Sequence, residues 1–277
     1  MRLEYLVDIE EMPLKEYIIH LGLSLRLAKK IKLYGKMYIN GTEALNYFVV
    51  KKGDLVVLEY NEAMNQEIVV NTTSLDILYE DDDLLVINKP HDLAIQPSRR
   101  HHEDNLISRV KALYVAKGIT SNVHIVNRLD YATSGLVIVA KNGFIHHQLT
   151  PQKAVIKKYL AIVEGRLAEP AGRINLPIAR LVEYDIRRAV SALGQEAITN
   201  YRVITEYEAA SLVEFNLETG RTHQIRVHMA AIGHPILGDK LYGTEKERLY
   251  LHCYFMEFVH PVTKEKLSFS KDSPWNV

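Results

Sequence analysis

The sequence lacks the features that mark secreted and membrane-bound proteins. It has a single cysteine, Cys253, so no disulfide can form within the chain and a reducing compartment is expected. No apolar run reaches the about 18 residues that a membrane span needs. The first residues carry acidic side chains rather than the basic and apolar regions of a signal peptide. We therefore predict a cytoplasmic protein with no membrane partner.

Motifs that hold nucleotide cofactors or metal ions are absent from the sequence. The stretch 233–243 contains glycines but does not form a dinucleotide-binding or P-loop pattern after a strand. Adjacent histidines at 101–102 and 146–147 diverge on any regular element. His223 and His228 lie about 140° apart around a helix, which does not suit one shared ion. The prediction is an activity that uses no metal, no nucleotide and no other cofactor.

The composition is that of an ordinary globular protein without net charge. Hydrophobic residues make up 47% and charged residues 25% of the 277, which excludes a disordered or collagen-like chain. Because Lys and Arg balance Asp and Glu, any nucleic-acid partner must be recognised by local basic clusters. No long exposed apolar stripe is evident, which predicts a monomer. Runs of strands with helices laid on them predict an α+β fold.

The first 62 residues form a unit with its own charge. Ser24 is expected to cap a helix in which Leu27 and Ile31 face inward, and short strands follow this helix. Between residues 13 and 52 there are eight Lys or Arg and two Glu, an excess of six positive charges in a neutral chain. A solvated, lysine-rich helix face is the simplest alternative explanation of this excess.

The order of these elements resembles the S4 RNA-binding domain. The resemblance rests on the segments LSLRLAKKI, GKMYING and VKKGDLV, at residues 23–31, 35–41 and 50–56. It implies a small α/β module at residues 1–62 that precedes the rest of the chain. Such a module would bind RNA phosphates through four basic side chains, those of Arg26, Lys29, Lys30 and Lys36.

Polar residues then indicate a connection, after which the pattern of a second unit begins. Residues 63–74 are the predicted linker, within which Ile68 to Val70 could add a short strand to either neighbour. Residues 76–90 indicate a β-hairpin that ends at Pro90, and residues 105–117 an amphipathic helix that packs on the sheet. Later strands that would extend an antiparallel sheet are predicted at 198–205, 212–217 and 250–258.

One stretch combines a buried strand with a polar turn. Leu136 to Ala140 is an apolar run typical of a strand buried on both faces. Before it, Arg128 and Asp130 place a guanidinium and a carboxylate in the loop at the N-terminal end of the strand. Catalytic groups often lie on such loops. The same turn could instead use Asp130 only to accept hydrogen bonds from the amides of Thr133 and Ser134.

Three blocks of the sequence resemble the RluA-like family of RNA pseudouridine synthases. They are residues 77–90, 127–136 and 220–228, and with the S4-like segment in front the resemblance covers nearly the whole chain. It implies a pseudouridine synthase fold at residues 75–277, with a largely antiparallel mixed sheet, flanking helices and a central cleft. The sequence departs from the family pattern at Asn127, where the family often has histidine.

The resemblance also implies roles for individual residues. Asp130 would be the catalytic carboxylate, acting on the ribose anomeric carbon or on uracil C6, and Arg226 the cation that keeps it ionised. Tyr159 would stack on the target base and take part in proton transfer. Three further residues would bind the substrate, of which the first would fill the space left by a flipped-out uridine: Arg128, Arg221 and Ile225.

We therefore predict an enzyme that isomerises specific uridines in structured RNA, with ribosomal RNA favoured over transfer RNA. The main alternative is a non-catalytic S4-type RNA-binding protein that serves ribosome assembly on the same scaffold. A glycoside or nucleoside hydrolase would need a second catalytic carboxylate, and no motif supplies one. The basic pairs at 99–100 and 187–188 could follow the RNA backbone or be ordinary solvated surface.

Overall fold

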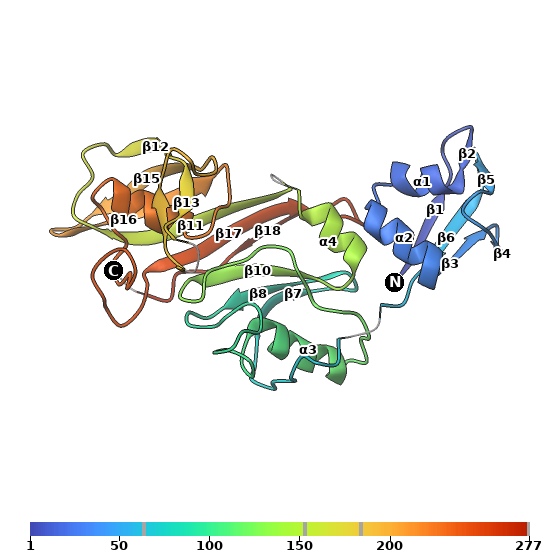
Figure 1. Cartoon of the computed structure of the whole chain (residues 1–277), viewed down its shortest axis with the longest axis horizontal. Coiled ribbons are helices and arrows are strands. Elements are labelled where there is room, and N and C mark those ends of the chain that lie inside the picture. The colour runs from blue at the N-terminus through green and yellow to red at the C-terminus, as the bar shows by residue number, and fades with distance from the viewer. Residues whose placement is uncertain (63–64, 152–153, 183–184, 276–277) are drawn as a thin grey trace.

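A ten-stranded mixed sheet forms most of the molecule, and a small four-stranded sheet lies at its N-terminal end (Figure 1). The computed structural model describes residues 1–62, 65–151, 154–182 and 185–275. Two residues of the predicted linker, 63 and 64, lie outside the described residues. The last two residues of the predicted catalytic region, 276 and 277, lie outside them as well.

The N-terminal unit packs two helices on short antiparallel strands. Its elements are β1 (Arg2–Leu6), β2 (Glu11–Pro13), α1 (Leu14–His20), α2 (Leu25–Tyr34), β3 (Lys36–Ile39), β4 (Thr42–Glu43), β5 (Val49–Lys51) and β6 (Leu55–Glu59). The sheet has the order β1-β6-β3-β4, and β2 pairs with β5. As predicted, the Ser24 hydroxyl caps α2 by accepting from the Leu27 amide, and Leu27 and Ile31 are buried.

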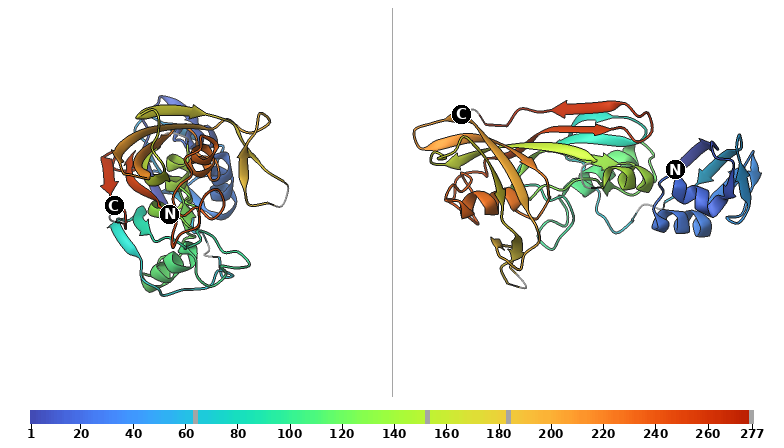
Figure 2. Two further views of the ribbon diagram at one scale, coloured as in Figure 1. Left: turned by 90° about the vertical axis from the view of Figure 1, so that its left-hand side faces the viewer. Right: turned by 90° about the horizontal axis from the view of Figure 1, so that it is seen from above.

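The large sheet is built from strands of the remaining chain. They are β7 (Asp76–Glu80), β8 (Leu84–Lys89), β9 (His124–Ile125), β10 (Ser134–Ala140), β11 (Val155–Glu164), β12 (Ala171–Asn175), β15 (Ile198–Glu206), β16 (Ala210–Leu217), β17 (Leu251–Val259) and β18 (Lys266–Ser270). Their order is β12-β15-β16-β11-β17-β10-β8-β7, with β18 beside β17 and β9 beside β10. A separate hairpin, β13 (Ile178–Arg180) and β14 (Arg188–Val190), projects from this sheet in both views of Figure 2.

Three helices accompany the large sheet: α3 (Leu106–Ala116), α4 (Gly143–Leu149) and α5 (Gln224–Ala231). The predicted helix at 105–117 is α3, which lies beside β7 and β8, whereas α4 lies between β10 and the N-terminal unit (Figure 1). α5 contacts β14 and β15. Within the described residues, no helix combines the length and the apolar character needed to cross a membrane.

The stretch from Ile68 to Val70 is not a strand, in contrast to the option raised by its sequence. The carbonyl of Ile68 accepts from the buried ammonium of Lys111 on α3. The Lys111 side chain thus supplies the hydrogen bond that a neighbouring strand would otherwise give to this carbonyl. The connection therefore follows the surface of α3 without extending either sheet.

The strand β10 is the centre of the fold. Each of its residues is buried, which confirms the prediction of a strand buried on both faces. It pairs antiparallel with β8 along its length, and parallel with β17 at Ser134 and Gly135. This parallel pairing makes an otherwise antiparallel sheet mixed. The predicted α+β fold with a largely antiparallel mixed sheet is confirmed.

Side chains tie the N-terminal unit to the large sheet. The Glu62 carboxylate lies 3.1 Å from Lys30 Nζ on α2 and 2.6 Å from His124 Nε2 on β9. The hydrogen bond from His124, more than offsetting burial, lowers the pKa of Glu62 to about 2. Gln148 on α4 donates to the carbonyl of Gly22 at 3.0 Å. Both ties reach elements that flank β10.

We expect Gly135→Ala to destabilise the protein by about 3 kcal/mol. Gly135 has φ of +119°, and a Cβ there would lie 2.3 Å from the Cys253 carbonyl oxygen of β17, which cannot move without breaking the sheet. Gly118→Ala is the matched control, because its φ is +68° but nothing lies within 4 Å. The control should cost about 1 kcal/mol. Urea unfolding measures both, and equal losses would contradict the role of the β10–β17 contact.

Candidate active site

Asp130 lies in the turn that leads into β10, and Asn127 holds this turn against the strand. The Asn127 amide donates to the Leu136 carbonyl at 3.2 Å and accepts from the Ile138 amide at 2.8 Å. The Thr133 amide donates to the main-chain oxygen of Asp130 at 3.1 Å. The Asp130 carboxylate, 26% exposed, is therefore left to face α5 instead of closing its own turn.

Arg226 on α5 stands between two carboxylates. Its Nη1 lies 3.4 Å from Asp130 Oδ2, while its Nε and Nη2 make a bidentate pair with Asp239 at 2.7 Å each. Asp239 is fully buried. Burial alone would lower the pKa of Arg226, but the Asp239 and Asp130 carboxylates raise it above its usual value. The guanidinium therefore stays charged, with Asp239 as its tighter partner.

His223, the residue before α5, also faces Asp130. The Tyr242 hydroxyl accepts from the Arg188 amide at 2.7 Å and shares a hydrogen bond of 2.8 Å with His223 Nδ1. The other ring nitrogen, Nε2, lies 3.9 Å from Asp130 Oδ2. Burial lowers the pKa of His223, and the Asp130 charge opposes that shift.

Two more polar groups are buried beside Asp130. Tyr159 on β11 is 7% exposed, and burial, followed by Cys253 and Asp130, raises its pKa well above the usual value. Its phenol therefore keeps its proton at neutral pH. Burial lowers the pKa of Lys89 to about 7, although Asp130 opposes this. The Lys89 ammonium is held at 2.9, 2.9 and 3.2 Å by the carbonyls of Pro90, Leu93 and Tyr131.

The structure brings Asp130, Tyr159 and Arg226 together. The three residues that were expected to bind the substrate lie in different environments. Arg128 is exposed on the turn. Arg221 is half-buried, and its Nε donates to the Glu196 carbonyl at 2.9 Å. Ile225 is 4% exposed and belongs to the hydrophobic core, so it supports α5 from within.

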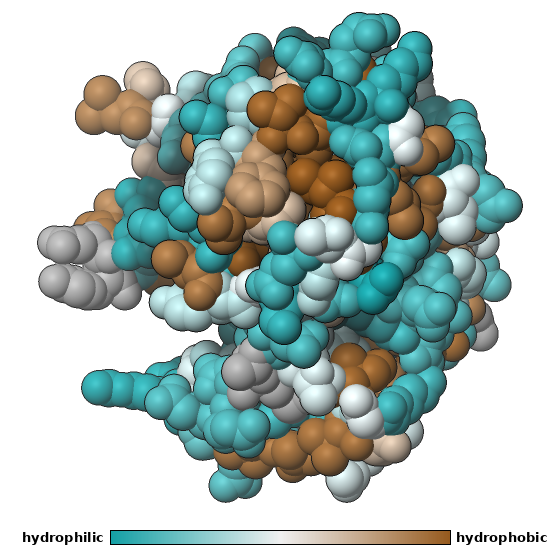
Figure 3. All heavy atoms as spheres, turned by 90° about the vertical axis from the view of Figure 1, so that its right-hand side faces the viewer, coloured by the Kyte–Doolittle hydropathy of each residue, from teal (hydrophilic) through white to brown (hydrophobic). Residues whose placement is uncertain are grey.

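The expected phosphate contacts of the N-terminal unit lie at the far end of the molecule from this site (Figure 1). Lys30 is half-buried and paired with Glu62. The exposed aromatic rings of Tyr47 and Phe48 meet edge to face at 5.2 Å. Figure 3 faces this end and shows hydrophobic atoms gathered among hydrophilic ones. The other three expected contacts are exposed: Arg26, Lys29 and Lys36.

Sequence reasoning missed several residues of the site. Asp239 lies in the stretch LGDKLYG, where an acidic residue among apolar residues and glycines could have indicated a buried partner for a cation. The sequence presents His223 only as a candidate metal ligand, and Lys89 only as one residue of the block 77–90. Nothing in the local pattern of Tyr242 points to its bond with His223.

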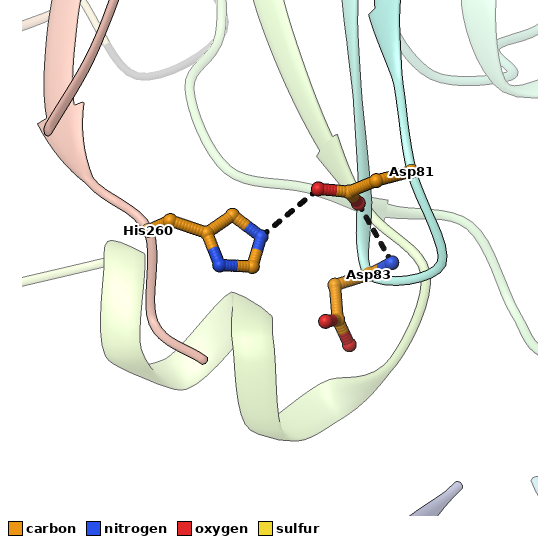
Figure 4. Close-up of side chains that lie close together, drawn as sticks. All are labelled: Asp81, Asp83 and His260. Carbon is orange, nitrogen blue, oxygen red and sulfur yellow. Dashed lines mark hydrogen bonds and ion pairs between the residues drawn. The ribbon is translucent and has the colours of Figure 1, made fainter. Parts of the chain in front are cut away.

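Away from this site, Asp81, Asp83 and His260 are a group of potential metal ligands within the described residues (Figure 4). His260 Nε2 lies 3.1 Å from Asp81 Oδ2, and its Nδ1 accepts from the amides of Val262 and Thr263. Asp81 also accepts from the Asp83 amide at 2.8 Å. The ion pair joins the residue that follows β17 to the β7–β8 turn.

Comparison with known proteins finds similarity over most of the chain. A family model described as RNA pseudouridylate synthase matches residues 83–231. YjbO of Bacillus subtilis, named an uncharacterized RNA pseudouridine synthase, is 39% identical over 95% of this chain and 96% of its own. Ribosomal large subunit pseudouridine synthase D of Vibrio cholerae is 34% identical over 89% of this chain and 82% of its own. The human structure titled RNA pseudouridylate synthase domain containing 1 covers 74% of this chain and 85% of its own, at 26% identity and a TM-score of 0.61.

We expect Asp239→Ala to destabilise the protein by about 3–5 kcal/mol, because it leaves the buried Arg226 guanidinium with only the more distant Asp130. The control is Glu245→Ala, which removes an ion pair to Lys240 whose side chains are more than half exposed. Such a pair contributes about 0–1 kcal/mol. Urea unfolding compares the two variants. Losses of equal size would show that Asp239 is not the anchor of Arg226.

Proposed function

The chain belongs to the RNA pseudouridylate synthase family and is an RNA pseudouridine synthase, and from this premise we propose that it isomerises specific uridines of ribosomal RNA with Asp130 as the catalytic carboxylate. The observation that carries the proposal is the position of this carboxylate. Within the described part of the chain, it forms no side-chain hydrogen bond to its own turn, and it faces the Arg226 guanidinium at 3.4 Å. Protonated Tyr159 lies close by.

The proposed reaction conserves all atoms of the substrate. The C1′–N1 glycosidic bond breaks, the uracil turns, and a C1′–C5 bond forms, while C5 loses a proton and N1 gains one. A base within a stack cannot offer both C1′ and C5, so the uridine is flipped out. The ionised Asp130 serves as nucleophile or electrostatic partner at the anomeric carbon or at uracil C6. The Arg226 guanidinium faces this carboxylate at 3.4 Å.

Tyr159 contacts the flipped-out nucleotide, and Arg128 fills the space that this nucleotide leaves in the RNA. The Tyr159 ring offers an aromatic face to the uracil, and its retained proton allows the hydroxyl to donate. Arg128 is exposed two residues before Asp130, where it can enter the RNA stack in place of the uridine.

The N-terminal unit, residues 1–62, acts as an S4-type RNA-binding module. Three exposed basic side chains in this unit support the proposal. The Tyr47–Phe48 pair adds rings on which unpaired bases can stack. Ribosomal RNA is favoured because the Vibrio cholerae relative is named for the large ribosomal subunit. The enzyme would then work in the cytoplasm, as a monomer and without a cofactor.

We expect Asp130→Asn to lower pseudouridine formation by about 10⁴-fold or more, since it removes the charge at nearly unchanged volume. Cells lacking the protein are given back the wild type, Asp130→Asn or the control Asp82→Asn, whose side chain is exposed in the β7–β8 turn. Carbodiimide labelling and primer extension then map pseudouridines in ribosomal and transfer RNA. Sites restored equally by Asp130→Asn would refute catalysis through Asp130, and sites confined to transfer RNA would refute the choice of ribosomal RNA.

Salt dependence tests the N-terminal module. The double variant Arg26→Gln/Lys29→Gln, made in inactive Asp130→Asn protein, should reduce the slope of log Kd against log salt by about 1.4–1.8, because two phosphate contacts are lost. Lys15→Gln is the control, since Lys15 is exposed on α1 and pairs with Glu16. Fluorescence anisotropy with a labelled ribosomal RNA fragment gives the slope. A slope equal to that of Lys15→Gln would rule out phosphate contact at these positions.

A further inference from the structure

Two aromatic rings from separate loops meet in the turn before β10. Tyr131 follows Asp130 in this turn and is 44% exposed, an unusual position for so large an apolar ring. His101 belongs to the loop before α3. The two rings are stacked, with their centroids 4.6 Å apart and their planes at 30°. His101 therefore covers one face of the Tyr131 ring, and the exposed area belongs to the rest of the ring.

A buried lysine holds the main chain of Tyr131. The Lys89 ammonium donates to the Tyr131 carbonyl at 3.2 Å, and to the carbonyls of Pro90 and Leu93 at 2.9 Å each. Lys89 is fully buried, so water does not compete for these bonds. The backbone at Tyr131 is thus fixed to the segment that follows β8, whether or not a ligand contacts the ring.

The loop that carries His101 is anchored in the same way. Asn105, fully buried at the N-cap of α3, donates from its side-chain NH2 to the carbonyls of His101 at 3.0 Å and His102 at 3.3 Å. The His101 amide donates to the Ser98 carbonyl at 3.1 Å. Buried polar side chains therefore position both loops, and the stacked rings form a preorganised surface at the edge of the site.

The same loop carries positive charge at the surface. Arg99 and Arg100 are both exposed. The Asp104 carboxylate is already compensated, because Arg109 on α3 donates to it through two bonds of 2.7 and 2.8 Å. The exposed Glu103 offsets one of the two arginines, which leaves the loop with a net positive charge. Basic side chains beside an aromatic ring are the combination by which proteins bind unpaired nucleotides.

We propose that the exposed face of Tyr131 stacks on an unpaired base near the target uridine, an inference that rests on the proposed function in taking RNA as the ligand. Adjacent Cα atoms are about 3.8 Å apart, so a base on Tyr131 belongs to a nucleotide close to the one that meets Asp130. An aromatic ring accepts any base, because every base has a π face. The ring positions the RNA chain beside the site, and Arg99 and Arg100 contact its phosphates.

The test combines a change of the ring with a change of the RNA. Tyr131→Leu and the matched control Tyr131→Phe, which keeps the ring, are each made in Asp130→Asn protein. They bind a short RNA with the mapped uridine, and versions of it in which each flanking nucleotide in turn lacks its base. One missing base should weaken Kd about tenfold for the Phe variant and less than about twofold for the Leu variant. Fluorescence anisotropy gives each Kd.

A second measurement reports the stacking itself. 2-Aminopurine replaces the base identified in this way, and its fluorescence should be quenched by the Phe variant but not by the Leu variant. Equal quenching by the two variants, or equal weakening by every missing base, would overturn the proposal. Binding needs no turnover, so these outcomes do not depend on whether Asp130 is catalytic. The RNA comes from whichever class carries the mapped uridine, so they do not depend on the choice of ribosomal RNA either.

Discussion

The bidentate pair between Arg226 and Asp239 is the interaction on which the site depends. Asp239 is fully buried, and its two bonds to Arg226 are shorter than the contact between Arg226 and Asp130. The guanidinium therefore has a fixed position and a compensated charge before any substrate arrives. Asp130 is therefore not needed to hold Arg226. One carboxylate anchors the guanidinium, and the other is left partly exposed beside it.

The strand β10 supplies the second constraint, because it fixes the turn that carries Asp130. Gly135 allows β10 and β17 to run parallel at close range, and Asn127 bonds the turn back onto the strand at Leu136 and Ile138. The NH2 and the oxygen of the Asn127 amide thus satisfy both main-chain groups. The turn that carries Asp130 is therefore held by a fully buried strand.

Three basic side chains of the N-terminal unit are exposed: Arg26, Lys29 and Lys36. This unit lies at one end of the molecule, and the β13–β14 hairpin lies toward the other (Figure 1). Phosphate contacts at the N-terminal unit would fix the position of a structured RNA on the protein.

Features that depend on neighbouring residues could be predicted from the sequence alone. The Ser24 cap, the helix α3, the β7–β8 hairpin and the burial of β10 follow from spacing and side-chain type within about ten residues. Which charges meet, in contrast, depends on the folded chain as a whole. Arg226 and Asp239 are 13 residues apart, Arg226 and Asp130 are 96 apart, and Lys30 is taken by Glu62 from 32 residues away. The two members of such a pair meet only when the chain between them folds back, and the local periodicity of the sequence does not predict this.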